Sequence, residues 1–129
     1  MQYITHKRFR GKTLSGEVNL SAKTLCSSED GFIFHNGKPI CLDTSENAHQ
    51  YFARNDDGNG MERGELTQSI QKTLAKRDTN HQKRWDKVWE DERCQKYKRM
   101  EHADYWLWNH EFFNAPIEDL RYVNHMVRL

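Results

Sequence analysis

The sequence has no long hydrophobic run, and this absence excludes the membrane-spanning class of protein. No stretch of its 129 residues approaches the roughly 20 apolar residues that a transmembrane helix needs. The first ten residues also lack the apolar segment of a secretory signal peptide. We therefore expect a protein that acts in the cytoplasm and has no membrane partner.

Cysteine is scarce, which argues against a disulfide framework. The chain has three cysteines, Cys26, Cys41 and Cys94, and none of them forms a Cys-x-x-Cys motif. An odd count without a signal peptide is typical of reduced thiols in a cytosolic protein. A zinc site formed by Cys26, His35 and Cys41 is the alternative, but their spacing matches no standard zinc module. Because reduced cysteines usually pack in cores, we expect no cofactor and no cysteine-bound metal.

The common motifs of hydrolytic catalysis are also missing. The chain has seven histidines but no His-Glu-x-x-His, no Gly-x-Ser-x-Gly and no glycine-rich phosphate loop. The nearest approach to a nuclease-like cluster is Asp104, His110 and Glu111. On an ideal helix His110 and Glu111 point away from the neighbouring aromatic residues. We therefore predict a non-enzymatic protein, with a small nucleic-acid-processing enzyme as the rival hypothesis.

Charge is abundant and nearly balanced. Charged residues make up 30% of the chain, the net charge is +1 and the mean hydropathy is −1.05. Such polarity can indicate disorder, but 12% of the residues are aromatic and recur at regular spacings. We therefore expect an ordered domain with a very polar surface.

The first 43 residues are typical of short strands joined by turns. Residues 32–35 and 39–42 flank Asn36-Gly37, the pair preferred in a type I′ hairpin turn because both positions need a positive φ. Pro39 should mark a strand start or an edge strand. The period-2 alternation of a half-buried strand is present at Val18, Leu20 and Ala22.

From residue 44 onward, the apolar spacing changes to that of helices. A break near Asp91–Arg93 separates two helical patterns, and the aromatic-rich helix over His102–Phe113 should be the most buried, with Trp106 and Trp108 inside. The expected helices begin after Ser45, near Glu62, after residues 78–80, near His102 and after Pro116. The predicted inner face of the last helix comprises Ile117, Leu120, Val123 and Val127.

These patterns together predict an α+β fold. We expect an N-terminal antiparallel β-meander, either a small partly open barrel or a sheet, packed on a C-terminal bundle of about four helices. The whole chain, 1–129, should be a single domain, with a β-rich part over 1–43 and a helical part over 44–129.

Two basic clusters are the candidate binding residues. The first surrounds an aromatic residue, which suits phosphate contact combined with base stacking, and consists of Lys7, Arg8, Phe9, Arg10 and Lys12. The second belongs to a stretch, 72–99, with ten bases against five acids, and consists of Lys83, Arg84, Lys87, Arg93, Lys96, Lys98 and Arg99. The alternative is that Trp85 and Trp89 face the core while the basic side chains only solvate the outside of a helix.

The loop over residues 55–60 is the candidate metal site. An EF-hand register that places Gly60 at position 6 puts Asn55, Asp57 and Asn59 at positions 1, 3 and 5. Position 12 is then Leu66, which cannot coordinate calcium. We therefore predict a turn rich in glycine, asparagine and aspartate that caps the adjacent helix, and no metal.

Several blocks of the sequence resemble small proteins encoded by phages and prophages of Gram-positive bacteria. The resemblance extends from about Tyr3 to Val123, and it is carried by Ser45–Gly60, Trp85–Asp91, Cys94–Arg99 and His102–His110. It implies a phage-encoded origin and action inside a bacterial host cell. It implies no activity and no particular functional residues.

The hypothesis is therefore a non-enzymatic, phage-derived binding protein in the bacterial cytoplasm, acting on a host or phage protein or on a nucleic-acid complex. Abundant tryptophan, tyrosine and arginine suit a protein interface, but they do not specify one. Besides the nuclease-like enzyme, a structural or assembly component of the phage particle is a further alternative.

Overall fold

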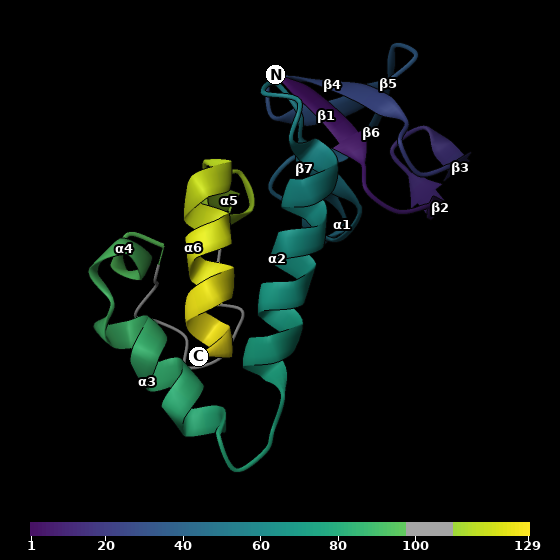
Figure 1. Cartoon of the computed structure of the whole chain (residues 1–129). Coiled ribbons are helices and arrows are strands. Elements are labelled where there is room, and N and C mark those ends of the chain that lie inside the picture. Colours follow the sequence, from purple (N-terminus) through teal and green to yellow (C-terminus); the bar gives the residue numbers. More distant parts are fainter. Residues whose placement is uncertain (98–109) are drawn as a thin grey trace. The chain divides into compact units, whose positions relative to one another are not determined.

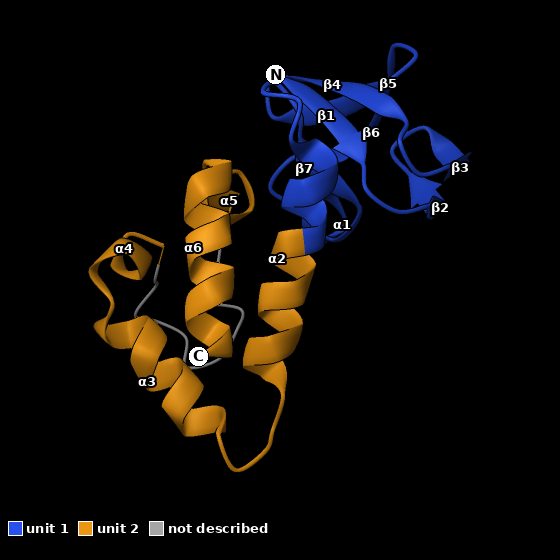
Figure 2. Ribbon diagram, in the orientation of Figure 1, with its two compact units in different colours: residues 1–65 blue, residues 66–129 orange. Residues whose placement is uncertain are grey.

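The computed structural model describes residues 1–97 and 110–129, and the chain divides into two compact units, 1–65 and 66–129 (Figures 1 and 2). An N-terminal antiparallel sheet is followed by helices, so the predicted α+β class is confirmed. The sheet is not closed, which selects the open sheet over the barrel.

Five strands form the main sheet of unit 1, in the order β6-β5-β4-β1-β7, and every pair is antiparallel. The strands are β1 (Gln2–Thr5), β4 (Leu25–Glu29), β5 (Phe32–His35), β6 (Lys38–Leu42) and β7 (Phe52–Arg54). Consecutive β4, β5 and β6 make the expected meander, while β1 and β7 add to its other side.

The β5–β6 hairpin turns at the predicted pair. Asn36 has φ of 52° and Gly37 has φ of 76°, the left-handed conformations that a type I′ turn requires. Pro39 lies near the start of β6, the edge strand of the sheet, which is where a proline is tolerated. Both local predictions are confirmed.

A separate two-stranded ribbon consists of β2 (Phe9–Thr13) and β3 (Gly16–Leu20). Phe9 lies opposite Leu20, and both side chains are buried, whereas the residues between them are more exposed. The predicted alternation ends with the strand, because Ala22 lies beyond β3 and is exposed.

The segment after Ser45 corrects the predicted boundary between strands and helices. The Ser45 hydroxyl accepts a hydrogen bond from the Ala48 N–H at 3.2 Å and caps α1 (Glu46–Tyr51), as expected. Ala48, Tyr51 and Phe52 have the i, i+3, i+4 spacing of a helix, but α1 ends at Tyr51 and the chain enters β7. There it pairs with β1, and Phe52 and Ala53 are only 3% and 4% exposed. Main-chain pairing and burial therefore outweigh the local helical spacing.

The core of unit 1 lies between the sheet, the ribbon and α1. Its buried members are Tyr3, Phe9, Leu20, Cys26, Ile33, Ile40, Ala48 and Phe52. The helix α2 (Gly60–Ala75) begins in this unit two residues before its predicted start.

Unit 2 contains the rest of α2 and the helices α3 (His81–Glu90), α4 (Glu92–Gln95), α5 (His110–Phe113) and α6 (Ile117–Arg128). The predicted helix break is confirmed: Asp91 ends α3, and its carboxylate caps α4 by accepting the Cys94 N–H at 3.0 Å. The predicted inner face of α6 is buried at Ile117, Leu120, Val123 and Val127, and Ile70 and Leu74 of α2 belong to the same core, with Leu66 partly buried against it.

Most of the predicted aromatic helix over His102–Phe113 lies outside the described residues, including Trp106 and Trp108. Its last four residues form α5, where Phe112 and Phe113 belong to the core of unit 2. Within the described parts of the chain, no helix has the length and apolar character needed to cross a membrane.

Candidate functional site

The first basic cluster lies at and just before β2, on its solvent side. Residues alternate across a strand, so the inward position of Phe9 turns Arg10 and Lys12 outward, and both are exposed. Lys7 and Arg8 precede the strand and are exposed as well. We call Lys7, Arg8, Arg10 and Lys12 the basic row.

The basic row is not neutralised within the described structure. Among residues 1–97 and 110–129, no carboxylate forms an ion pair with any of its four side chains. Glu17 lies opposite Lys12 in the ribbon register, yet the two side chains do not form a salt bridge. Solvated cations without a carboxylate partner are available for an anionic ligand.

Phe9 does not belong to this surface, which corrects the sequence prediction. Its side chain is 3% exposed, and its ring centroid lies 5.1 Å from that of Tyr51 and 5.6 Å from that of Phe52. A ring that is buried on both sides cannot stack on a base. Phe9 instead anchors β2 in the core.

Tyr51 is the aromatic residue that the sequence prediction missed. Its side chain is half-buried, one edge contact joins it to Phe9, and the Lys7 ammonium lies 4.9 Å from its ring centroid. Lys7 therefore makes a cation–π contact with it. Nothing in the linear spacing links residues 7 and 51; the contact exists because α1 packs beside the ribbon.

Arg84, in the second basic cluster, is buried and does not belong to the candidate surface. It is 9% exposed, its guanidinium lies 3.0 Å from the Asp78 carboxylate, and it donates to the Lys76 carbonyl at 2.6 Å. These contacts fasten the connection between α2 and α3. Both terminal nitrogens of the buried guanidinium are thus engaged within the fold, on Asp78 and on the Lys76 carbonyl.

Lys96 and Arg93 are compensated by one carboxylate. Asp119 in α6 lies 2.6 Å from Lys96 Nζ and 3.0 Å from Arg93 Nη2, and it accepts the Tyr97 hydroxyl at 2.5 Å. Burial of Asp119 opposes its ionisation, but these three donors outweigh the effect and hold its pKa at about 2. The side chains of Lys96 and Arg93 remain half-exposed, with their charge balanced.

The other members of the second cluster do not form a shared patch. Lys87 donates to the Leu129 carbonyl, while Lys83 is exposed and, in the described parts of the chain, has no ion-pair partner. Lys98 and Arg99 lie outside the described residues. The basic row is therefore the more coherent uncompensated set.

The loop over residues 55–60 uses its polar groups internally. Asp57 receives two hydrogen bonds from Arg63, at 2.7 and 3.1 Å, and a third from the Asn59 N–H at 3.0 Å. The bonds from Arg63 are the largest influence on the Asp57 pKa and hold it well below its usual range. Asn55 Oδ1 accepts the Gly60 N–H at 2.8 Å at the start of α2. This is the turn-and-cap arrangement that the sequence predicted.

Within the described ranges, no three His, Cys, Asp or Glu side chains are grouped as a metal ion would require. Cys26 is buried, and burial raises its thiol pKa to about 11. Of the nuclease-like cluster, Asp104 lies outside the described residues, while His110 and Glu111 are part of α5. That alternative stays a prediction.

Comparison with known proteins gives no relative from which a function could be transferred. No family model matches the chain, and no curated protein or solved structure matches it either.

Proposed function

We propose that the protein is a phage-derived binding protein of the bacterial cytoplasm, without enzymatic activity, that holds a host or phage macromolecule through the basic row. The ligand class is a nucleic acid, or a complex that presents an equivalent anionic surface. Lys7, Arg8, Arg10 and Lys12 supply the contacts.

One observation carries the proposal: the four side chains of the basic row are exposed and without carboxylate partners in the described structure, whereas Arg84, Arg93 and Lys96 are compensated by Asp78 and Asp119. Cations in a paired strand and in the segment directly before it, as in the basic row, lose less conformational freedom on binding than cations on a mobile tail. Charge of this kind also accelerates encounter with a polyanion.

The test is capture from a lysate of a Gram-positive host, with and without nuclease and at two salt concentrations. The wild-type chain is compared with Arg8→Glu/Arg10→Glu, and with Lys23→Glu/Lys38→Glu as the matched control. The control reverses two exposed charges of the same unit outside the row. We expect the row variant to lose the captured macromolecule and the control to retain it. Equal capture by all three proteins would overturn the assignment.

A further inference from the structure

We propose that the basic row binds the sugar–phosphate backbone of a single-stranded nucleic acid and that Tyr51 receives one of its bases. The inference rests on the proposed function and specifies its ligand. It is carried by three features of unit 1: the spacing of the row, the restraint of the ribbon, and the position of Tyr51 beside Lys7.

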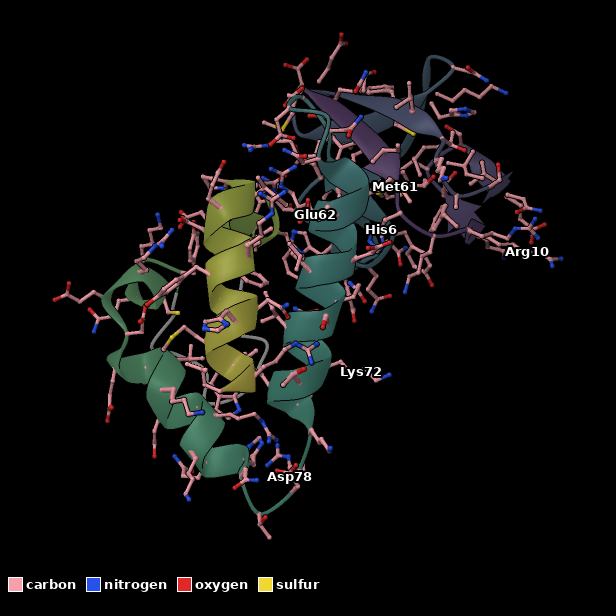
Figure 3. All side chains as sticks on the ribbon, in the orientation of Figure 1. His6, Arg10, Met61, Glu62, Lys72 and Asp78 are labelled. Atoms are coloured by element: carbon pink, nitrogen blue, oxygen red, sulfur yellow. The ribbon has the colours of Figure 1, made fainter. Side chains whose placement is uncertain are left out.

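The spacing of the row suits an extended phosphate chain. Alternate residues on one face of a strand lie about 7 Å apart, which is comparable to the separation of successive phosphates in an extended single strand. Arg10 and Lys12 have this relationship in β2, and Arg8 precedes them by the same two-residue step. Figure 3 shows Arg10 projecting from the β2–β3 ribbon, away from the rest of unit 1. Consecutive phosphates can therefore meet consecutive cations.

The restraint of the ribbon argues against insertion into a duplex. A two-stranded ribbon fits the major groove of DNA when it can enter the groove as a free element. Here the inner face of the ribbon is buried through Phe9 and Leu20. Its tip is tied to β6, because Leu14 N donates to the Ile40 carbonyl at 3.3 Å and Ser15 Oγ to the Pro39 carbonyl at 2.7 Å. Only the outer face is open, and it can follow one nucleic-acid strand as far as the Lys7 end of the row, where the Tyr51 ring lies.

Tyr51 supplies the aromatic surface that non-specific single-strand binders use. Base stacking on an aromatic ring tolerates any sequence, because every base has a π face. The Tyr51 ring is seated edge to face on Phe9 and is covered by the Lys7 ammonium at 4.9 Å. A stacking base takes the place of that ammonium, and Lys7 then pairs with the adjacent phosphate. The Lys7 ammonium therefore stays close to the nucleic-acid strand when it leaves the Tyr51 ring.

The probe is a fluorescently labelled 20-nucleotide oligothymidylate, compared with a mixed-sequence duplex of the same length by fluorescence anisotropy. We expect at least tenfold tighter binding of the single strand. Four phosphate contacts predict that log Kd rises with log salt concentration with a slope of about 3. Arg8→Glu/Arg10→Glu should abolish binding, while Lys23→Glu/Lys38→Glu should retain it.

Tyr51 is tested with a pair of substitutions. Tyr51→Leu should weaken oligothymidylate binding about tenfold, the loss expected for one stacked base, whereas Tyr51→Phe keeps the ring and should bind like the wild-type chain. Circular dichroism of each variant reports whether unit 1 remains folded. If Tyr51→Leu destabilises unit 1, the test of base stacking depends on two other measurements. These are the binding of oligothymidylate by the Tyr51→Phe protein and the preference for single-stranded over duplex DNA.

Two results would overturn the inference. One is equal or tighter binding of the duplex; the other is undiminished binding by a folded Tyr51→Leu protein. If no oligonucleotide binds, yet lysate capture still depends on Arg8 and Arg10 and survives nuclease, the single-strand inference fails and the proposed function stands, with a protein as the ligand. If capture is also independent of the row, both fail.

Discussion

The side chain of Arg63, in the first turn of α2, is fully buried, and its guanidinium lies 2.7 Å from the carboxylate of Asp57 in the preceding loop. The same guanidinium donates to the Arg54 carbonyl at the end of β7, at 2.6 Å. One buried cation thus joins the edge strand, the loop and the start of the helix. Because a buried charge without a partner is costly, this contact is a point of vulnerability in unit 1.

Asp57→Asn should lower the free energy of unfolding by roughly 2 kcal/mol, less than the 3–5 kcal/mol typical of a fully buried pair. The expected loss is smaller than that of a fully buried pair because the Asp57 side chain is 35% exposed. Urea denaturation monitored by tryptophan fluorescence and circular dichroism measures the change. Glu29→Gln is the control, since it removes one exposed negative charge from β4. Equal stability of Asp57→Asn and Glu29→Gln would show that Arg63 needs no counter-charge.

Acid should weaken unit 2 through Asp119. Its pKa of about 2 lies below the ordinary value of 3.8, so its ionised form stabilises the fold at neutral pH. That contribution, on the order of 2 kcal/mol, should disappear as the pH falls from about 4 to 2. The stability difference between wild-type and Asp119→Asn proteins should shrink over this window. The exposed neighbour Glu118, replaced by Gln, should show no such convergence.

His6 should make unit 1 sensitive to mild acid. Burial and, to a lesser extent, the charge of Lys7 lower its pKa from 6.5 to about 4. The unfolded chain therefore binds the proton more readily, and stability should decline as the pH falls from about 6.5 to 4. His6→Gln should make the unfolding midpoint nearly independent of pH over this range. His125→Gln, at an exposed site in α6, should keep the pH dependence of the wild-type protein. If the His6→Gln protein kept the pH dependence of the wild-type protein, His6 would not be the source of the acid sensitivity.

Gly64→Ala should destabilise the chain, although alanine normally stabilises a helix more than glycine does. A Cβ at position 64 would lie 2.2 Å from Cγ of His6, and the contact is with the base of the imidazole, which cannot swing away easily. We expect a loss of about 1–3 kcal/mol from overpacking. The double variant Gly64→Ala/His6→Ala should recover part of it. Gly11→Ala, where nothing lies within 4 Å of the new Cβ, is the matched control.

The three thiols should differ in reactivity. Cys26 and Cys94 are buried, whereas Cys41 is partly exposed, and burial raises the pKa of both Cys26 and Cys41. An aromatic disulfide reagent at pH 8 should therefore label Cys41 slowly and first, and should label the other two only on unfolding. Mass spectrometry of the labelled peptides gives the order. Rapid labelling of Cys26 or Cys94 in the native protein would contradict their burial.

The features that the sequence predicted well depend on local physics. Asn36-Gly37 makes the hairpin because both residues tolerate a positive φ, and this is independent of the rest of the fold. The inner face of α6 follows from helical period alone, since Ile117, Leu120, Val123 and Val127 must share one side. Asp91 interrupts α3 because its side chain can cap α4.

The features that were missed depend on contacts between distant segments. Phe52 has the spacing of a helical residue, but β1 offers an unpaired edge to residues 52–54 and draws them into the sheet. The two basic clusters look alike in sequence. Asp119 lies 26 residues from Arg93 in the chain and still neutralises it, because α4 and α6 are neighbours in unit 2.

The candidate site shows the same division. The sequence by itself determined that cations are concentrated before and within β2, and that a strand there would send alternate residues to opposite sides. Only the tertiary structure decided that Phe9 is the inward residue, that Tyr51 lies beside Lys7, and that the basic row remains without carboxylate partners in the described chain. The physical reason is that charge and periodicity are properties of neighbouring residues, whereas burial and ion pairing depend on which distant segments the fold brings into contact.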